Sequence, residues 1–265
     1  MNSKLNDLKD ILGDMKSVLI AFSGGVDSTF LVKVARDTLG DRAVAVTAHS
    51  ESYPDRELKE ARRLAADIGV RHIIIDTEEL KDTKFSSNPA RRCFWCKTEL
   101  FKNLRTIAKE ENLSFVIDGA NYDDTGDFRP GIEAADKLDV RHPLIELKMT
   151  KEDIRSISRE LKLETWNKPA YACLASRIPY GENITGEKLV MVEKAEEFLK
   201  SIGMEQVRVR NSSCTARIEV DQGNISKLSQ KGVRDEIVKE FRKLGYKYVT
   251  LDLQGYRSGS MNEVL

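Results

Sequence analysis

Short apolar runs alternate with amphipathic segments up to about residue 150 of the chain. The runs predict four strands, "SVLIAFS" (17–23), "AVAVTAHS" (43–50), "RHIIIDT" (71–77) and "SFVIDGAN" (114–121). Between them, apolar residues recur at helical spacing and predict helices over 28–39, 55–68 and 93–109. A fifth strand is expected near "RHPLIEL" (141–147). Nearly continuous apolar strands separated by helices are typical of a parallel sheet covered by helices on both faces, so the sequence predicts an α/β fold.

The order of elements changes after "WNKPAYACLASRIPYGENIT" (166–185), which is rich in proline and small residues. Before this segment, Thr150 is predicted as a helix N-cap with Asp153 at the third helical position, close to a capping box. Beyond it, the pattern predicts a helix over 186–202, strands over 206–210 and 216–220, a helix over 233–244 and a strand over 246–251. That is an α+β order. We therefore expect a parallel-sheet domain over residues 1–180 and a smaller α+β domain over 181–265.

Charge and composition narrow the class of protein. The 265 residues include 43 Lys and Arg and 43 Asp and Glu, a balance that is not typical of a protein with a large nucleic-acid footprint. The amino terminus has no continuous apolar segment, and no stretch reaches the roughly 18 apolar residues of a membrane helix. We expect a cytoplasmic protein without membrane contact, in which thiols stay reduced. The three histidines argue against a histidine-rich metal site.

The stretch "AFSGGVDSTF" (21–30) lies where the first predicted strand ends and the first helix begins. Gly24 and Gly25 have no side chains, so backbone N–H groups there can face an anion. Ser23 and Ser28 add hydroxyl donors, and the helix brings the positive end of its dipole. The lysine pattern of a Walker loop is absent. The sequence predicts a phosphate-binding loop, and the alternative is a glycine-rich turn with incidental serines.

This loop resembles the PP-loop of ATP pyrophosphatases, whose fingerprint is SGGxDS after an initial strand. The resemblance implies a Rossmann-like PP-loop domain that cuts ATP between its α- and β-phosphates and holds the pyrophosphate while a substrate is adenylated. It also implies that Asp27 lies close to the phosphates or their Mg²⁺, and the alternative is a helix cap. Asp118 and Gly119 end the fourth predicted strand, at the edge where open parallel sheets bind ligands, and are candidates for the ATP pocket. The alternative for them is an ordinary strand-end turn.

Two of the four cysteines, Cys93 and Cys96, form a Cys-x-x-Cys pair at the start of a predicted helix. Residues at i and i+3 share one face of a helix, so the two thiolates can bind one metal centre. With Cys173 they make three thiolates, which suit a 4Fe–4S cluster with one iron left open for an extra sulfide. Cys214, at a predicted turn, is taken as a bystander. The alternatives are a zinc site with Cys214 as fourth ligand, a disulfide, or buried core residues.

Stretches along nearly the whole chain then carry a more specific resemblance. They are the PP-loop, "DFRPG" (127–131), "WNKPAYACLASRIPYG" (166–181), "VRVR" (207–210) and "GYKYVTLDLQGYRSGSMN" (245–262). Together they resemble the LarE family. The resemblance implies an ATP-dependent sulfur transferase of nickel-pincer cofactor biosynthesis. Such an enzyme adenylates the carboxylates of pyridinium-3,5-biscarboxylic acid mononucleotide and converts them to thiocarboxylates.

The family is known in two types, one that sacrifices the sulfur of a single cysteine and one with three cysteines around a 4Fe–4S cluster. Cys93, Cys96 and Cys173 make this chain resemble the cluster type, which is reloaded from sulfide or another sulfur donor. The alternative is Cys173 alone as a sacrificial donor. The resemblance also allows homo-oligomers that assemble through the second domain.

The resemblance further implies a site for the substrate phosphate, made by Ser176, Arg177, Arg208 and Arg210. The alternative is a solvated, salt-bridged strand face. Arg129 is a further candidate on the ATP or substrate side.

Two rival functions stay open. A tRNA thiolase can also combine a PP-loop with three cysteines, but the neutral net charge and the lack of a clear basic arm count against it. A non-catalytic nucleotide-binding module stapled by zinc would bind ATP without releasing pyrophosphate, and would unfold when a ligand cysteine is replaced.

Overall fold

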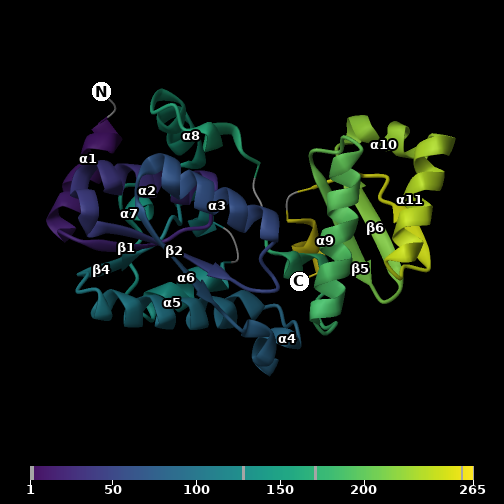
Figure 1. Cartoon of the computed structure of the whole chain (residues 1–265), viewed down its shortest axis with the longest axis horizontal. Helices are drawn as coiled ribbons and strands as arrows, with labels where there is room; N and C mark the ends of the chain where they lie inside the picture. Colours follow the sequence, from purple (N-terminus) through teal and green to yellow (C-terminus); the bar gives the residue numbers. More distant parts are fainter. Residues whose placement is uncertain (1–2, 127–128, 170–171, 258, 265) are drawn as a thin grey trace. The chain divides into compact units, whose positions relative to one another are not determined.

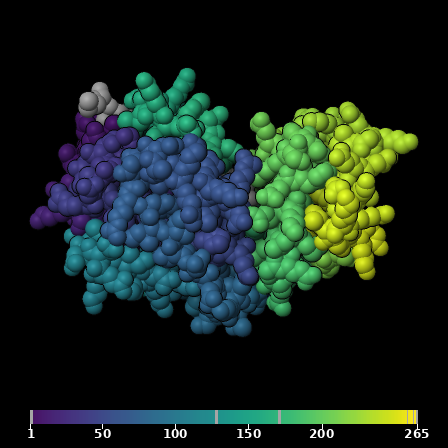
Figure 2. Space-filling model, in the orientation of Figure 1, coloured from purple at the N-terminus to yellow at the C-terminus, as the bar shows by residue number. Residues whose placement is uncertain are grey.

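The computed structural model describes residues 3–126, 129–169, 172–257 and 259–264. The chain forms two compact units (Figure 1). Unit 1 comprises residues 1–79 and 91–171, and unit 2 comprises 80–90 and 172–265. The same sequence colours mark the surface of the units in Figure 2. No helix of the described residues is long and apolar enough to span a membrane.

Unit 1 is built on a four-stranded parallel sheet of order β3-β2-β1-β4. Its strands are β1 (Val18–Ala21), β2 (Ala43–His49), β3 (Arg71–Asp76) and β4 (Phe115–Ile117). Its α-helices are α1 (Ser3–Met15), α2 (Val26–Leu39), α3 (Asp55–Ile68), α5 (Arg92–Glu110), α6 (Pro130–Asp136), α7 (Pro143–Glu146) and α8 (Lys151–Glu160). Short 3₁₀ turns lie at Gly40–Arg42, Tyr122–Gly126 and Glu164–Asn167, and another, Glu79–Lys81, begins at the last residue of the first segment of unit 1. The four predicted strands and the α/β class are confirmed.

Successive residues of β1 enter different cores, which explains why this strand is apolar throughout. Val18 and Ile20 pack into a core with α1, α2, α3 and α8. Leu19 packs into a second core with α5 and α6. Helices therefore cover both faces of the sheet, as a buried parallel sheet requires.

The fifth predicted strand is wrong. Arg141 makes only an isolated parallel bridge to Ile117, and the chain then enters α7. Pro143 has no N–H to donate to a strand ladder, but its fixed φ suits the first turn of a helix. Helix α1 was not predicted, although Leu5, Leu8 and Leu12 form a buried stripe on it at helical spacing.

Unit 2 is built on a three-stranded sheet of order β5-β6-β7. Strands β5 (Val207–Ser212) and β6 (Thr215–Val220) are antiparallel, and β6 pairs in parallel with β7 (Tyr248–Leu251). The helices are α4 (Thr83–Ser86), α9 (Gly186–Ser201), α10 (Gln222–Ser229) and α11 (Lys231–Lys243), with 3₁₀ turns at Leu174–Arg177 and Ser260–Val264. Every element predicted beyond residue 185 is present, within two residues at each end, and α10 is additional.

The segment 80–90 belongs to unit 2, and Asn88 connects it to residues 178–181 by hydrogen bonds. The buried Asn88 side chain donates to the carbonyls of Ile178 (3.2 Å) and Pro179 (2.7 Å). The Asn88 carbonyl accepts from Gly181 N at 3.0 Å. Unit 2 therefore comprises residues 80–90 and 172–265, whereas a single boundary after residue 180 was expected from the sequence.

Candidate active site

The phosphate loop connects β1 to α2 in unit 1. Gly24 has φ +66°, a conformation that strains residues with a side chain, and a Cβ on it would lie 3.4 Å from Ala61 Cα of α3. Gly25 is the N-cap residue of α2. The Ser23 and Ser28 hydroxyls lie 3.2 Å apart, and Ser28 Oγ accepts from Ser23 N at 3.3 Å. The predicted loop residues therefore form one compact turn at the positive end of α2.

Asp27 follows the loop in the first turn of α2. Its Oδ2 forms an ion pair with Lys151 Nζ, whereas Oδ1 is buried without a hydrogen-bond partner among the described residues. Burial raises the pKa of Asp27, although the charge and hydrogen bond of Lys151 act in the opposite direction. A buried carboxylate oxygen with no protein donor fits a divalent cation, which prefers oxygen ligands. Gly25 is the residue that caps α2, so capping does not account for Asp27.

Lys151 was not predicted as a site residue. It is the first residue of α8, where the predicted capping box is present. Thr150 N donates to Asp153 Oδ2 at 2.9 Å, and Asp153 N donates to Thr150 Oγ1 at 3.2 Å. Lys151 N also donates to Asp123 Oδ2 at 2.8 Å. The start of α8 is therefore fixed, and this places the Lys151 ammonium at Asp27.

Asp118 and Gly119 lie at the carboxyl end of β4. A Cβ on Gly119 would lie 2.9 Å from Ser28 N, so the strand end packs directly on the phosphate loop. Asp118 Oδ1 lies 2.6 Å from His142 Nδ1 and accepts from Ala120 N at 3.0 Å. Burial alone would lower the pKa of His142, but the hydrogen bond and charge of Asp118, with the charge of Asp136, outweigh it and raise the pKa. No pattern in the sequence connects His142 with this strand end.

Cys93 and Cys96 lie in the first turn of α5, Cys93 exposed and Cys96 half-buried. Phe94 between them packs edge-on against Trp95 at 5.1 Å between ring centroids. The Lys137 ammonium lies 4.9 Å from the Phe94 centroid and links this turn to α6. The Cys-x-x-Cys turn is therefore held by aromatic packing on unit 1.

Cys173 lies in unit 2, just before the 3₁₀ turn Leu174–Arg177. Arg177 Nη1 donates to the carbonyls of Ala172 (2.6 Å) and Cys173 (3.0 Å). Arg177 also pairs with both oxygens of Glu196 at 2.8 and 2.9 Å, entirely buried. Cys214 lies at the turn between β5 and β6. In the part of the chain that the structure describes, no three His, Cys, Asp or Glu side chains are grouped as metal ligands, so the three-cysteine site stays a prediction.

The other predicted substrate residues are also in unit 2. Arg210 is buried, pairs with Glu219 at 2.9 and 2.7 Å, and donates to the Ser176 carbonyl at 2.9 Å. The guanidinium of Arg208, also buried, lies 5.1 Å from the centroid of the Tyr256 ring. The structure brings Ser176, Arg177 and Arg210 together. Arg177 and Arg210 are salt-bridged as the alternative supposed, but they are buried and not solvated.

Parts of the predicted motifs lie outside the described residues. These are Asp127 and Phe128 of "DFRPG", Ala170 and Tyr171 before Cys173, and Ser258 in the C-terminal stretch. Arg129 is described and pairs with Asp124 at 2.9 Å.

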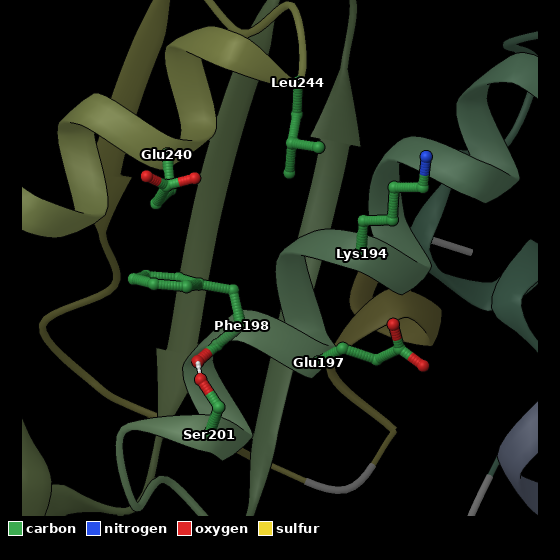
Figure 3. A pocket seen from close by; sticks show the side chains of 6 residues that line it. All are labelled: Lys194, Glu197, Phe198, Ser201, Glu240 and Leu244. Carbon is green, nitrogen blue, oxygen red and sulfur yellow. Dashed lines mark hydrogen bonds between the residues drawn. The ribbon is translucent and has the colours of Figure 1, made fainter.

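An open hollow of about 380 Å³ lies on unit 2 between α9 and the end of α11 (Figure 3). It is lined by Lys194, Glu197, Phe198, Ser201, Glu240 and Leu244. Ser201 Oγ donates to the Phe198 carbonyl at 2.7 Å, which belongs to the end of α9 itself. None of the predicted site residues lines this hollow.

The chain is similar in sequence to one protein family model and to proteins of several organisms. Residues 17–93, which include the phosphate loop, match the family model of the queuosine biosynthesis protein QueC. An uncharacterized protein of Synechocystis is 46% identical over 100% of this chain and 99% of its own length. The pyridinium-3,5-bisthiocarboxylic acid mononucleotide synthase of Lactiplantibacillus plantarum is 37% identical over 96% of this chain and 92% of its own. An uncharacterized protein of Methanocaldococcus jannaschii is 30% identical over 96% of this chain and 95% of its own.

Proposed function

The chain belongs to the LarE family, and from this premise we propose that it is an ATP-dependent sulfur transferase acting on pyridinium-3,5-biscarboxylic acid mononucleotide. The observation that carries the proposal is the 37% identity to the Lactiplantibacillus plantarum synthase over 96% of the chain. The phosphate loop supports it, because adenylation of a carboxylate requires a site for the pyrophosphate of ATP.

The reaction has two steps for each carboxylate of the substrate. A carboxylate oxygen of the substrate attacks the α-phosphorus of ATP, so that an acyl adenylate forms and pyrophosphate leaves. A sulfur nucleophile then attacks the acyl carbon and expels AMP, which leaves a thiocarboxylate. Pyrophosphate carries most of the charge that develops in the first step, so preorganised donors around it favour that step.

Within unit 1, each loop residue has a role in the first step. Ser23, Gly24, Gly25 and Ser28 surround the β- and γ-phosphates with N–H and hydroxyl donors. Asp27 would hold Mg²⁺ through its unpartnered Oδ1, which fits a hard cation. Asp118 and Gly119 line the nucleotide pocket at the adjacent strand end, where parallel sheets bind ligands.

For the second step we assign the sulfur site to Cys93, Cys96 and Cys173. Three thiolates would hold a 4Fe–4S cluster with one open iron, and such a cluster supplies a sulfide. Cys93 and Cys96 occupy one helical turn, so their spacing fits ligands of one centre. Arg177 fixes the backbone of Cys173 through its carbonyl. Sulfide or another sulfur donor would restore the cluster after each turnover.

In unit 2 we assign the substrate phosphate to Ser176, Arg177, Arg208 and Arg210. Glu196 and Glu219 already engage Arg177 and Arg210, so these two arginines shape the site and orient Ser176. The Arg208 guanidinium lies over the Tyr256 ring and donates to the Val207 carbonyl at 2.8 Å, and its positive charge is our candidate for the contact with the phosphate. Assembly into homo-oligomers stays a prediction.

The experiment that tests this function begins with anaerobic purification, followed by iron and sulfide counting and a visible absorption spectrum. We expect about four irons and four sulfides per chain. We also expect AMP and pyrophosphate release that depends on the dicarboxylate mononucleotide, with a thiocarboxylate product seen by mass spectrometry. Cys93→Ser, Cys96→Ser and Cys173→Ser should each lose iron, whereas Cys214→Ser should keep it.

Other outcomes assign the chain differently. Stoichiometric zinc in a colourless protein contradicts the cluster. Loss of the elements of H₂S from Cys173 after one turnover identifies that residue as a sacrificial donor. AMP release that depends on tRNA and not on the mononucleotide overturns the substrate class.

A further inference from the structure

Three consecutive carbonyls of the phosphate loop are each held by a side chain. Tyr53 Oη, in the loop after β2, donates to the Ser23 carbonyl at 2.9 Å. Lys168 Nζ, in the segment after α8, donates to the Gly24 carbonyl at 3.1 Å. Ser28 Oγ donates to the Gly25 carbonyl at 3.3 Å. Two of the three donors come from outside the loop and its helix.

Lys168 uses all its donors inside unit 1. Besides the Gly24 carbonyl, its ammonium pairs with Glu57 at 2.8 Å and with Glu60 at 3.0 Å, both on α3. An ammonium has three N–H donors, and these three contacts account for them. The side chain is only 15% exposed, and Glu57 is buried. Because two carboxylates already neutralise its charge, Lys168 is suited to hold the loop and not to bind a phosphate directly.

The segment that carries Lys168 is itself fixed. Arg155 of α8 donates to the backbone carbonyls of Trp166 (3.2 Å) and Lys168 (2.9 Å). Lys168 N donates to the Thr165 carbonyl at 2.9 Å. The ammonium is thus attached to a rigid backbone, and its contact with Gly24 has a defined direction.

Fixing a carbonyl also fixes the next amide. A trans peptide is planar, and its C=O and N–H point in opposite directions. The contact of Tyr53 with the Ser23 carbonyl therefore turns the Gly24 N–H to the opposite side of the loop. The contact of Lys168 with the Gly24 carbonyl does the same for the Gly25 N–H, which makes one long hydrogen bond, to Ser23 Oγ at 3.4 Å. Glycine at these positions would otherwise leave both peptide planes free to rotate.

We propose that Lys168 and Tyr53 are positioning residues of the phosphate loop, which hold its peptide planes so that the Gly24 and Gly25 amides face the pyrophosphate. The proposal rests on the proposed function only in that the loop binds the phosphates of ATP. It assigns Tyr53 and Lys168 a role that they exert through the carbonyls of the loop. Preorganised donors stabilise a developing charge without the cost of reorganisation during the reaction.

The test uses the full chain and two ligands, inorganic pyrophosphate with Mg²⁺ and AMP, measured by equilibrium binding. Lys168→Met removes the contact with Gly24 but leaves the buried Glu57 without its ammonium. The double variant Lys168→Met/Glu57→Gln removes the same contact without leaving that charge. Glu57→Gln alone keeps the contact. Tyr53→Phe deletes only the hydroxyl, and Lys33→Met, which breaks an exposed ion pair on α2, is the matched control.

We expect the double variant and Tyr53→Phe to bind pyrophosphate about tenfold more weakly, with AMP binding changed less than about twofold. Glu57→Gln and Lys33→Met should bind both ligands like the wild type. Lys168→Arg should restore part of the pyrophosphate affinity, because its guanidinium can still donate to a carbonyl.

Two results would overturn the proposal. One is unchanged pyrophosphate binding in the double variant and in Tyr53→Phe. The other is an equal loss of pyrophosphate and AMP binding, which indicates general damage to unit 1. In both cases the proposed function stands if the wild type binds pyrophosphate. A wild-type chain that does not bind pyrophosphate refutes the ATP chemistry and this inference with it.

Discussion

Gly119 at the end of β4 lies so close to Ser28 in α2 that a Cβ on Gly119 would be 2.9 Å from Ser28 N and 3.1 Å from Ser28 Cα. Both of these are backbone atoms, so no rotamer change relieves the clash. The phosphate loop and the neighbouring strand end are thus in direct backbone contact. The glycine that was predicted as a pocket residue is also needed for packing.

Gly119→Ala should therefore move the start of α2. We expect the free energy of unfolding to fall by about 1–3 kcal/mol, as for other overpacked positions. Pyrophosphate binding should weaken by about five- to tenfold, since a displacement of loop donors by a fraction of an ångström weakens several hydrogen bonds at once. Urea denaturation and equilibrium binding measure the two effects.

Gly13→Ala in α1 is the control, because a Cβ there meets nothing within 4 Å. Alanine in a helix is more favourable than glycine, so this variant should be slightly stabilised. Equal behaviour of the two alanine variants would show that the Gly119 contact is not tight in solution.

The loop was predictable because its signals are local. Glycines and serines at a strand-to-helix junction are adjacent in the sequence, so Ser23 to Ser28 could be identified together. Lys151 and Lys168 could not, because their contacts with the loop region join residues 124 and 144 positions apart. An ion pair leaves no periodic pattern in the sequence. Only the capping box around Thr150 indicated that the start of α8 has a defined position.

The remaining differences also have physical causes. The segment after Arg141 is apolar like a strand, but Pro143 ends the ladder after one bridge. The segment 80–90 joins unit 2 through the Asn88 side chain, which makes long-range bonds that the residue type alone does not indicate. The buried ion pairs of Arg177 with Glu196 and of Arg210 with Glu219 depend on how β5, β6 and α9 pack, which no local pattern in the sequence indicates.

His142 should make the stability of unit 1 depend on pH. Burial lowers the pKa of His142, but Asp118 and Asp136 outweigh this effect and bring it above its ordinary value of 6.5. A raised pKa means that the folded protein binds the proton more tightly than the unfolded chain. The stabilisation is thus complete below about pH 6.5 and is lost as pH rises through the folded pKa. Urea denaturation at several pH values should show His142→Gln to be most destabilising at the acid end.

His72 provides a control, because its pKa is shifted in the opposite direction to that of His142. Burial lowers the pKa of His72, so its protonation opposes folding and its contribution to stability is lost as pH falls below the unfolded value. The pH slopes of His72→Gln and His142→Gln relative to the wild type should therefore differ in sign. Parallel slopes would contradict the charged pair of His142 and Asp118.

Lys151 should set the acid limit of ATP use. Burial raises the pKa of Asp27, and Lys151 counteracts that rise by its charge and hydrogen bond. If ionised Asp27 holds Mg²⁺, pyrophosphate release must fall as pH drops through this pKa. Lys151→Met removes the lowering contribution and should move the acid limb of the pH–rate profile to higher pH. Lys33→Met, on α2 like Asp27, should leave the acid limb of the profile at the same pH as in the wild type. If the acid limb of Lys151→Met also stays at the wild-type pH, ionisation of Asp27 does not limit the reaction.

Replacing Arg208 should weaken substrate binding, whereas replacing Glu196 should lower the stability of unit 2. Arg208→Ala removes a buried cation that lies over the Tyr256 ring and whose charge also acts on Glu196. We expect KM for the mononucleotide to rise about 10- to 100-fold, as for the loss of a hydrogen bond to a charged group, with kcat little changed.

Glu196→Gln leaves the buried Arg177 without its counter-ion and should lower the free energy of unfolding by about 3–5 kcal/mol. Steady-state kinetics and denaturation of both variants test this division, and an unchanged KM in Arg208→Ala would remove Arg208 from the phosphate site.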